Sequence, residues 1–131
     1  MAIQIENVVV CDLVRMEDTG KHLIIGVYPN DIRFASLPNN INLNIWVQFR
    51  VDANWDGQVE VRVQDDKKEI LFHARAEISK QSQNKGELLT ITVPEILLGI
   101  ASPTTLSFQI RQPKKRWQML KQMPVKLRTE P

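Results

Sequence analysis

The chain has 131 residues, a length that fits one domain with its own core. Its single cysteine excludes an intrachain disulfide, and no apolar run is long enough to span a membrane as a helix. The first ten residues lack the pattern of a secretory signal peptide. We therefore expect a soluble, cytoplasmic domain over 1–131, with residues 128–131 as a frayed tail.

The charge is unevenly distributed although the formal net charge is only +2. Residues 1–66 contain ten acidic and five basic residues, whereas 67–131 contain five acidic and twelve basic ones. The asymmetry has two explanations. Oppositely charged strands lie near each other within one domain, or a basic face receives an acidic partner.

Residues 7–28 predict a β-hairpin with two buried strands. Apolar runs at 8–16 and 22–28 flank the polar turn 17–21. In that turn Gly20 suits a positive φ. Gly26, inside the second run, predicts a bulge or a close approach of neighbouring backbone.

The middle of the chain alternates between connections and strands. Residues 29–42 predict a long irregular connection, which Ile32, Phe34 and Leu37 are expected to pin to the core. A strand is predicted at 43–51. Asp56-Gly57 then predicts a tight hairpin turn into the next strand, 58–64.

The second half predicts further strands at 70–79, 88–93, 104–112 and 117–127, with a solvated loop at 79–87. Pro94 is expected to stop one strand, with a short helix or bent strand after it. Pro124 predicts that the last strand lies at a sheet edge. About eight alternating strands without helical periodicity predict an all-β fold, an antiparallel β-sandwich, with a β-barrel as the alternative.

The first hairpin carries a distinctive order of residues: Cys11, Asp12, Val14, Arg15, Glu17, Gly20, Lys21, Ile24, Ile25, Gly26, Val27 and Tyr28. This order resembles the opening of a bacterial family of small β-sandwich domains of unknown function. Members of that family begin with Cys-Asp-x-Val-Arg-x-Glu, followed by Gly-Lys and Leu-Ile-Gly-Val-Tyr. The resemblance implies a β-sandwich of bacterial or phage origin, and it supplies no activity and no catalytic residue.

Four polar residues of this segment form a candidate site: Asp12, Arg15, Glu17 and Tyr28. Arg15 and Glu17 are two residues apart, so they are expected to share a strand face and to form an ion pair. The alternative is a ligand site formed by all four.

Metal and thiol chemistry have weaker support. Residues 52–57, Asp-Ala-Asn-Trp-Asp-Gly, match the opening of an EF-hand loop and raise calcium-dependent binding as an alternative. The twelfth position is Val63 where the motif needs Glu, which favours a plain turn.

A thiol-enzyme hypothesis places Cys11 and His22 opposite each other across the first hairpin. The alternative is that Cys11 is an inert core cysteine. No catalytic residue, cofactor or metal site is predicted.

The C-terminal segment forms a candidate basic face with seven members: Arg111, Lys114, Lys115, Arg116, Lys121, Lys126 and Arg128. Trp117 lies among them, a combination that suits nucleic acid or another anionic ligand. The alternative is a charged edge strand that prevents aggregation. Trp46, on a polar strand face, is expected to be covered by loop 29–42 or to anchor an interface. Trp117 is a second candidate interface aromatic.

The absence of a complete catalytic motif favours a non-enzymatic domain that binds another protein or associates with itself, with a homodimer as one form. The first alternative is nucleic-acid or anionic-ligand binding through residues 111–128, and the second is calcium-dependent binding through 52–57. No membrane partner is expected.

Overall fold

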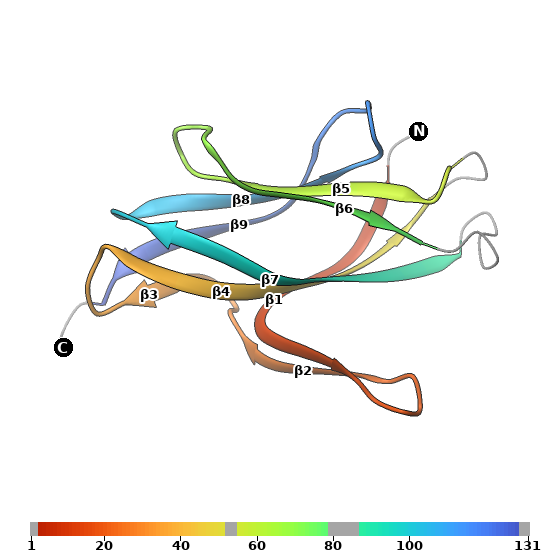
Figure 1. Cartoon of the computed structure of the whole chain (residues 1–131), viewed down its shortest axis with the longest axis horizontal. Helices are drawn as coiled ribbons and strands as arrows, with labels where there is room; N and C mark the ends of the chain where they lie inside the picture. Colours follow the sequence, from red (N-terminus) through yellow and green to blue (C-terminus); the bar gives the residue numbers. More distant parts are fainter. Residues whose placement is uncertain (1–2, 52–54, 79–86, 129–131) are drawn as a thin grey trace.

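The computed structural model describes residues 3–51, 55–78 and 87–128, which form two packed β-sheets (Figure 1). The strands are β1 (Gln4–Met16), β2 (His22–Val27), β3 (Ile32–Phe34), β4 (Asn39–Arg50), β5 (Gln58–Gln64), β6 (Ile70–Glu77), β7 (Leu88–Ile100), β8 (Thr104–Arg111) and β9 (Gln118–Leu127). The described residues contain no helix, and hence none long and apolar enough to cross a membrane.

The first sheet has the strand order β2-β1-β4-β7, and the second has the order β3-β9-β8-β5-β6. Neighbouring strands are antiparallel except for the short pair of β3 and β9, which is parallel. The predicted all-β sandwich is confirmed, with nine strands in place of about eight. The additional strand, β3, lies within the predicted connection 29–42. Ile32 is buried there, and Phe34 and Leu37 pack against the core as predicted.

Alternation along the strands builds the core between the two sheets. β4 contributes Leu43, Ile45, Val47 and Phe49, and all four are fully buried. The second sheet meets them with apolar residues of similar spacing: Val59, Val61 and Val63 of β5, and Leu106, Phe108 and Ile110 of β8. Because successive side chains of a strand point to opposite faces, each sheet keeps one face for the core and one for other contacts.

The hairpin predicted at Asp56-Gly57 is wrong, because β4 and β5 belong to different sheets. The local turn chemistry is present: Gly57 has a φ of 90°, and Asp56 Oδ1 accepts a hydrogen bond from Gln58 N at 3.0 Å. Trp55, just before β5, is anchored in the core. Its ring is buried edge-on against Phe49, and its Nε1 donates to Gln58 O at 2.8 Å. Alternation alone cannot distinguish a hairpin from such a crossover.

Two prolines differ in part from their predictions: Pro94 does not stop its strand, although the bent strand expected after it is present. β7 continues through Pro94 as a bent strand, because Pro94 and Glu95 form a bulge where the register with β4 shifts. β9 lies between β8 and β3, so the predicted edge position is wrong. Pro124 is still tolerated there, since β3 pairs only with Val125–Leu127 and no neighbour on that side needs its missing N–H.

Candidate functional site

β1 changes partners halfway along its length. Its first part pairs with β4 as far as Cys11, and its second part, Cys11–Met16, pairs with β2. Figure 1 shows the resulting hairpin set apart from the two packed sheets. We call residues 12–27 the arm. The prediction that both strands of this hairpin are buried is therefore wrong, because the second half of β1 has left the sandwich.

The outward side of the arm is apolar. Leu13 pairs with Ile25, and Arg15 pairs with Leu23, so these side chains share one face. Leu13, Leu23, Ile25 and Val27 are between 42% and 52% exposed, and we call these four residues the arm face. Val14, His22 and Ile24, on the other side, are partly buried. A contiguous apolar surface of this kind is typical of an interaction site.

Asp12 fixes the bend at which the arm leaves the sheet. Its Oδ1 accepts a hydrogen bond from the Tyr28 hydroxyl at 2.6 Å, and its backbone oxygen accepts one from Asn44 Nδ2 at 2.8 Å. Gly26 has a φ of 72°, and a side chain at this position would overlap the Asp12 carboxylate. Burial, and then the hydrogen bond to Asp12 and its charge, raise the pKa of Tyr28 to about 12. These contacts hold the arm in one orientation.

The predicted polar set of four residues is therefore divided. Asp12 and Tyr28 meet at the bend, whereas Arg15 and Glu17 lie toward the tip of the arm. Among the described residues Arg15 and Glu17 form no ion pair, so that prediction is wrong. Arg15 points to the same side of the arm as Leu13, whereas Asp12 points to the opposite side. Arg15 and Glu17 are therefore separate from the contact between Asp12 and Tyr28.

The structure separates Cys11 from His22, against the thiol-enzyme hypothesis. Cys11 pairs with Val27, and His22 pairs with Met16 at the other end of the hairpin. Cys11 is fully buried, and burial raises the pKa of its thiol against the smaller opposing effect of the Leu13 backbone. The ring of His22 instead meets the Trp46 ring, with centroids 6.2 Å apart. Trp46 is half-buried, and its ring contact comes from the arm. The two predictions for Trp46, a cover by loop 29–42 and a role as an interface anchor, stay predictions.

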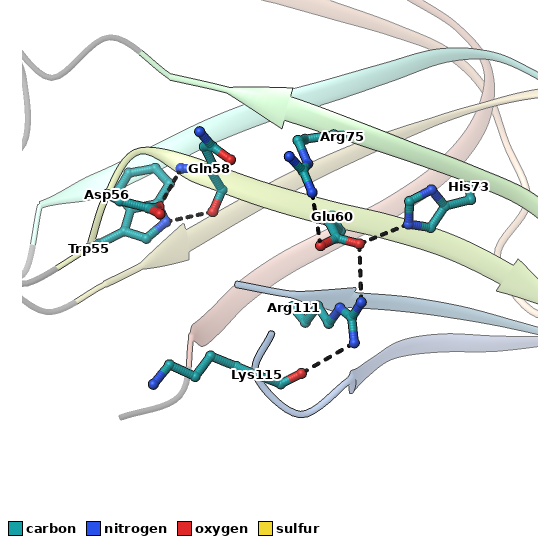
Figure 2. A network of polar contacts seen from close by, with 8 residues as sticks. All are labelled: Trp55, Asp56, Gln58, Glu60, His73, Arg75, Arg111 and Lys115. Atoms are coloured by element: carbon teal, nitrogen blue, oxygen red, sulfur yellow. Dashed lines mark hydrogen bonds and ion pairs between the residues drawn. The ribbon is translucent and has the colours of Figure 1, made fainter. Parts of the chain in front are cut away.

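A second notable group lies on the outer face of the second sheet, centred on Glu60 (Figure 2). Its side chain is only 6% exposed although it points away from the core. Glu60 Oε2 lies 2.8 Å from His73 Nε2 and 3.3 Å from Arg111 Nη2, and Oε1 lies 3.6 Å from Arg75 Nη2. The hydrogen bond with His73 lowers the pKa of Glu60 against the opposing effect of burial, and Arg111 and Arg75 lower it further. A buried carboxylate is tolerated because these partners compensate its charge.

Trp117 lies beside this group. The guanidinium carbons of Arg62 and Arg111 are 4.2 and 4.3 Å from its ring centroid, within the range of a cation–π contact. The His73 ring approaches it edge-on at 6.1 Å. Burial, and then the charge of Arg111, lower the pKa of Arg62, which stays positively charged near neutral pH.

Sequence reasoning placed Arg111 and Trp117 in a basic face but missed Glu60, Arg62, His73 and Arg75. These residues come from strands that are distant in sequence. The only available signal was the charged, outward parity of Glu60 and Arg62 on β5.

The predicted basic face divides between the two ends of β9. Lys114, Lys115 and Arg116 are exposed in the turn between β8 and β9, next to Arg111 and Trp117. Toward the other end, Lys121 Nζ donates to Pro29 O at 3.3 Å, Lys126 Nζ lies 3.9 Å from Asp31, and Arg128 N donates to Phe34 O at 2.7 Å. Only the first group combines clustered positive charge with an aromatic ring.

The predicted calcium loop 52–57 falls partly outside the described residues, which omit 52–54. Trp55 and Gly57 are buried, and the Asp56 carboxylate accepts the hydrogen bond from Gln58 N. Across the described ranges, no group of three or more His, Cys, Asp or Glu side chains is placed to hold a metal ion.

Comparison of the sequence with protein-family models and with curated proteins gives no match.

The contacts of Glu60 predict an acid-dependent loss of stability. Because they lower its pKa from 4.5 in the folded state, they stabilise the fold above about pH 4.5, and this contribution disappears as the pH falls through the lowered value. We expect Glu60→Gln to cost about 1–3 kcal/mol at neutral pH and less at about pH 3, measured by urea denaturation. Glu77→Gln, an exposed carboxylate on β6, is the control. Equal losses for Glu60→Gln at both pH values would refute the assignment.

The bend predicts an abnormal tyrosine titration. Tyr28 is the only tyrosine of the chain, so phenolate absorbance reports on it alone. At about pH 11, between the ordinary pKa of 10.0 and the raised value of about 12, the folded protein should show little phenolate, and urea should produce the full signal. Asp12→Asn should increase the phenolate signal of the folded protein. Equal absorbance with and without urea would contradict the proposed environment.

Proposed function

We propose that the chain is a non-enzymatic protein-binding domain that pairs with a second copy of itself through the β2 edge of the arm. The observation that carries the proposal is the arm face, four large apolar side chains exposed on a hairpin that stands apart from the core. Apolar side chains that lie outside the core and remain partly exposed to water are stabilised when a partner covers them.

The four edge strands of the sandwich differ in how they are protected. β3 is three residues long and carries Arg33, and β6 presents Arg75 and Glu77 on its outer face. β7 carries the bulge at Pro94 and Glu95. β2 has six residues, HLIIGV, with neither proline nor lysine among them. Within the part of the chain that the structure describes, β1 is its only neighbour in the sheet. Unprotected apolar edges of this kind favour pairing with another strand.

Antiparallel pairing of β2 with the β2 of a second copy would give hydrogen-bond partners to the backbone N–H and C=O groups of this edge. Such pairing is two-fold symmetric, so it closes after two chains and leaves no β2 edge for further growth. It would join the two first sheets and bring the two arm faces side by side. The bend at Asp12 supports the proposal, because an arm held in one orientation loses less conformational entropy on association.

The same proposal places the domain in the cytoplasm of a bacterial cell, acting without a cofactor. The bacterial origin rests on the resemblance of the first hairpin, and the single cysteine, which cannot form an intrachain disulfide, fits a reducing compartment.

Light scattering coupled to size exclusion tests the proposal. We expect the wild-type chain to shift from monomer to dimer with rising concentration. Ile25→Lys should weaken association by about tenfold or more, because a lysine on the arm face would have to be desolvated in the dimer. The matched control is Leu97→Lys on β7, where the native leucine is 67% exposed outside the arm. A monomer at every concentration, or equal effects of the two variants, would contradict the proposal.

A further inference from the structure

The outer face of the second sheet is positively charged at one end. The acid at its centre, Glu60, is buried and surrounded by His73, Arg75 and Arg111, so its charge is compensated. Arg75 remains 58% exposed. The electrostatic potential at this part of the surface is therefore mainly positive. The adjoining turn adds three exposed bases, Lys114, Lys115 and Arg116. The exposed acid of this face, Glu77, lies opposite Gln58 at the same end of the sheet as this turn, but on β6, two strands away from β8.

The turn that carries these three bases is held by the sheet. Lys115 N donates to Gln112 O at 3.0 Å, and Arg111 Nη1 donates to Lys115 O at 3.5 Å. Figure 2 shows the Lys115 side chain extending away from Glu60, so the backbone is anchored while the ammonium group stays outside the network. A positioned cluster of cations binds an anion at a lower entropic cost than a mobile one.

Trp117 directly follows this turn and is partly exposed. The guanidinium groups of Arg62 and Arg111 hold its indole, as described above. The opposite end of the same sheet has a different character, since the turn between β5 and β6 carries three acids, Asp65, Asp66 and Glu69, against two lysines, Lys67 and Lys68. A polyanion would be attracted more strongly to the turn 112–116, which carries bases and no acid.

From this arrangement we propose that Trp117 and the turn 112–116 form a binding site for single-stranded nucleic acid. Lys114, Lys115 and Arg116 contact successive phosphates, and an unpaired base packs against the exposed part of Trp117. The aromatic ring favours a nucleic acid over an acidic peptide, because a carboxylate-rich partner needs the cations but gains little from the indole. The site lies on the second sheet and does not depend on pairing through β2 in the first.

Fluorescence anisotropy of a labelled oligothymidine of about twelve nucleotides tests the proposal. We expect binding at low salt with an affinity that falls as salt rises, with a log–log slope of about −2 for three phosphate contacts. Replacing Lys114, Lys115 and Arg116 together by glutamine should weaken binding at least tenfold. The matched control, Lys67→Gln with Lys68→Gln, removes two exposed lysines from the turn at the opposite end of the sheet and should leave binding unchanged.

Trp117→Leu tests the stacking contact separately. It should weaken binding by about fivefold or more in a protein whose circular dichroism remains native. Ile25→Lys should bind as the wild type does, since the arm is not involved. The absence of binding at low salt, or an equal affinity of the triple glutamine variant, would overturn the proposal. Displacement of the oligonucleotide by polyglutamate, together with an unchanged affinity of Trp117→Leu, would identify an acidic protein surface instead and would also overturn it.

Discussion

The bend of β1 at Asp12 is the constraint on which the position of the arm depends. One continuous strand pairs with β4 as far as Cys11 and with β2 beyond it. Three residues converge on Asp12 at the bend: Tyr28 through its hydroxyl, Asn44 through its side-chain amide, and Gly26, whose missing side chain leaves room for the Asp12 carboxylate. A larger residue at position 26 or an unpaired carboxylate at position 12 would act against this geometry. The apolar residues beyond the bend consequently lie outside the core, where they are available to a partner.

The second sheet contains a carboxylate, that of Glu60, which is buried on the outer face. Glu60 is stable there because His73, Arg75 and Arg111 meet it from two neighbouring strands. Arg111 also contacts the Trp117 ring and donates a hydrogen bond to the Lys115 carbonyl in the adjoining turn. One network thus orders both the aromatic ring and the basic turn. The molecule has an apolar surface on one sheet and a cationic surface on the other, and each has its own structural origin.

Alternation of apolar residues predicted the strands and the sandwich, because burial on one face leaves a period of two in the sequence. It could not predict which sheet a strand joins, and so Asp56-Gly57 was interpreted as a hairpin although the turn chemistry was right. It also could not show that the apolar residues of the arm lie outside the core, since an exposed apolar strand has the same pattern as a buried one. The Glu60 network was missed for a related reason: its members meet only through strand pairing. The sequence pattern of the first hairpin identified Asp12 and Tyr28 as candidate site residues. The contact between them depends on the bend of β1, which the pattern does not show.

The central claim is that the outer edge of β2 is the surface through which two chains pair. Amide hydrogen exchange of residues 22–27 tests it most directly, because the N–H groups of β2 that point away from β1 gain partners only on pairing. The account predicts that these amides exchange rapidly in dilute protein and become protected as the concentration rises, while the amides of β3 do not change. Equal exchange of the β2 amides at all concentrations would contradict it.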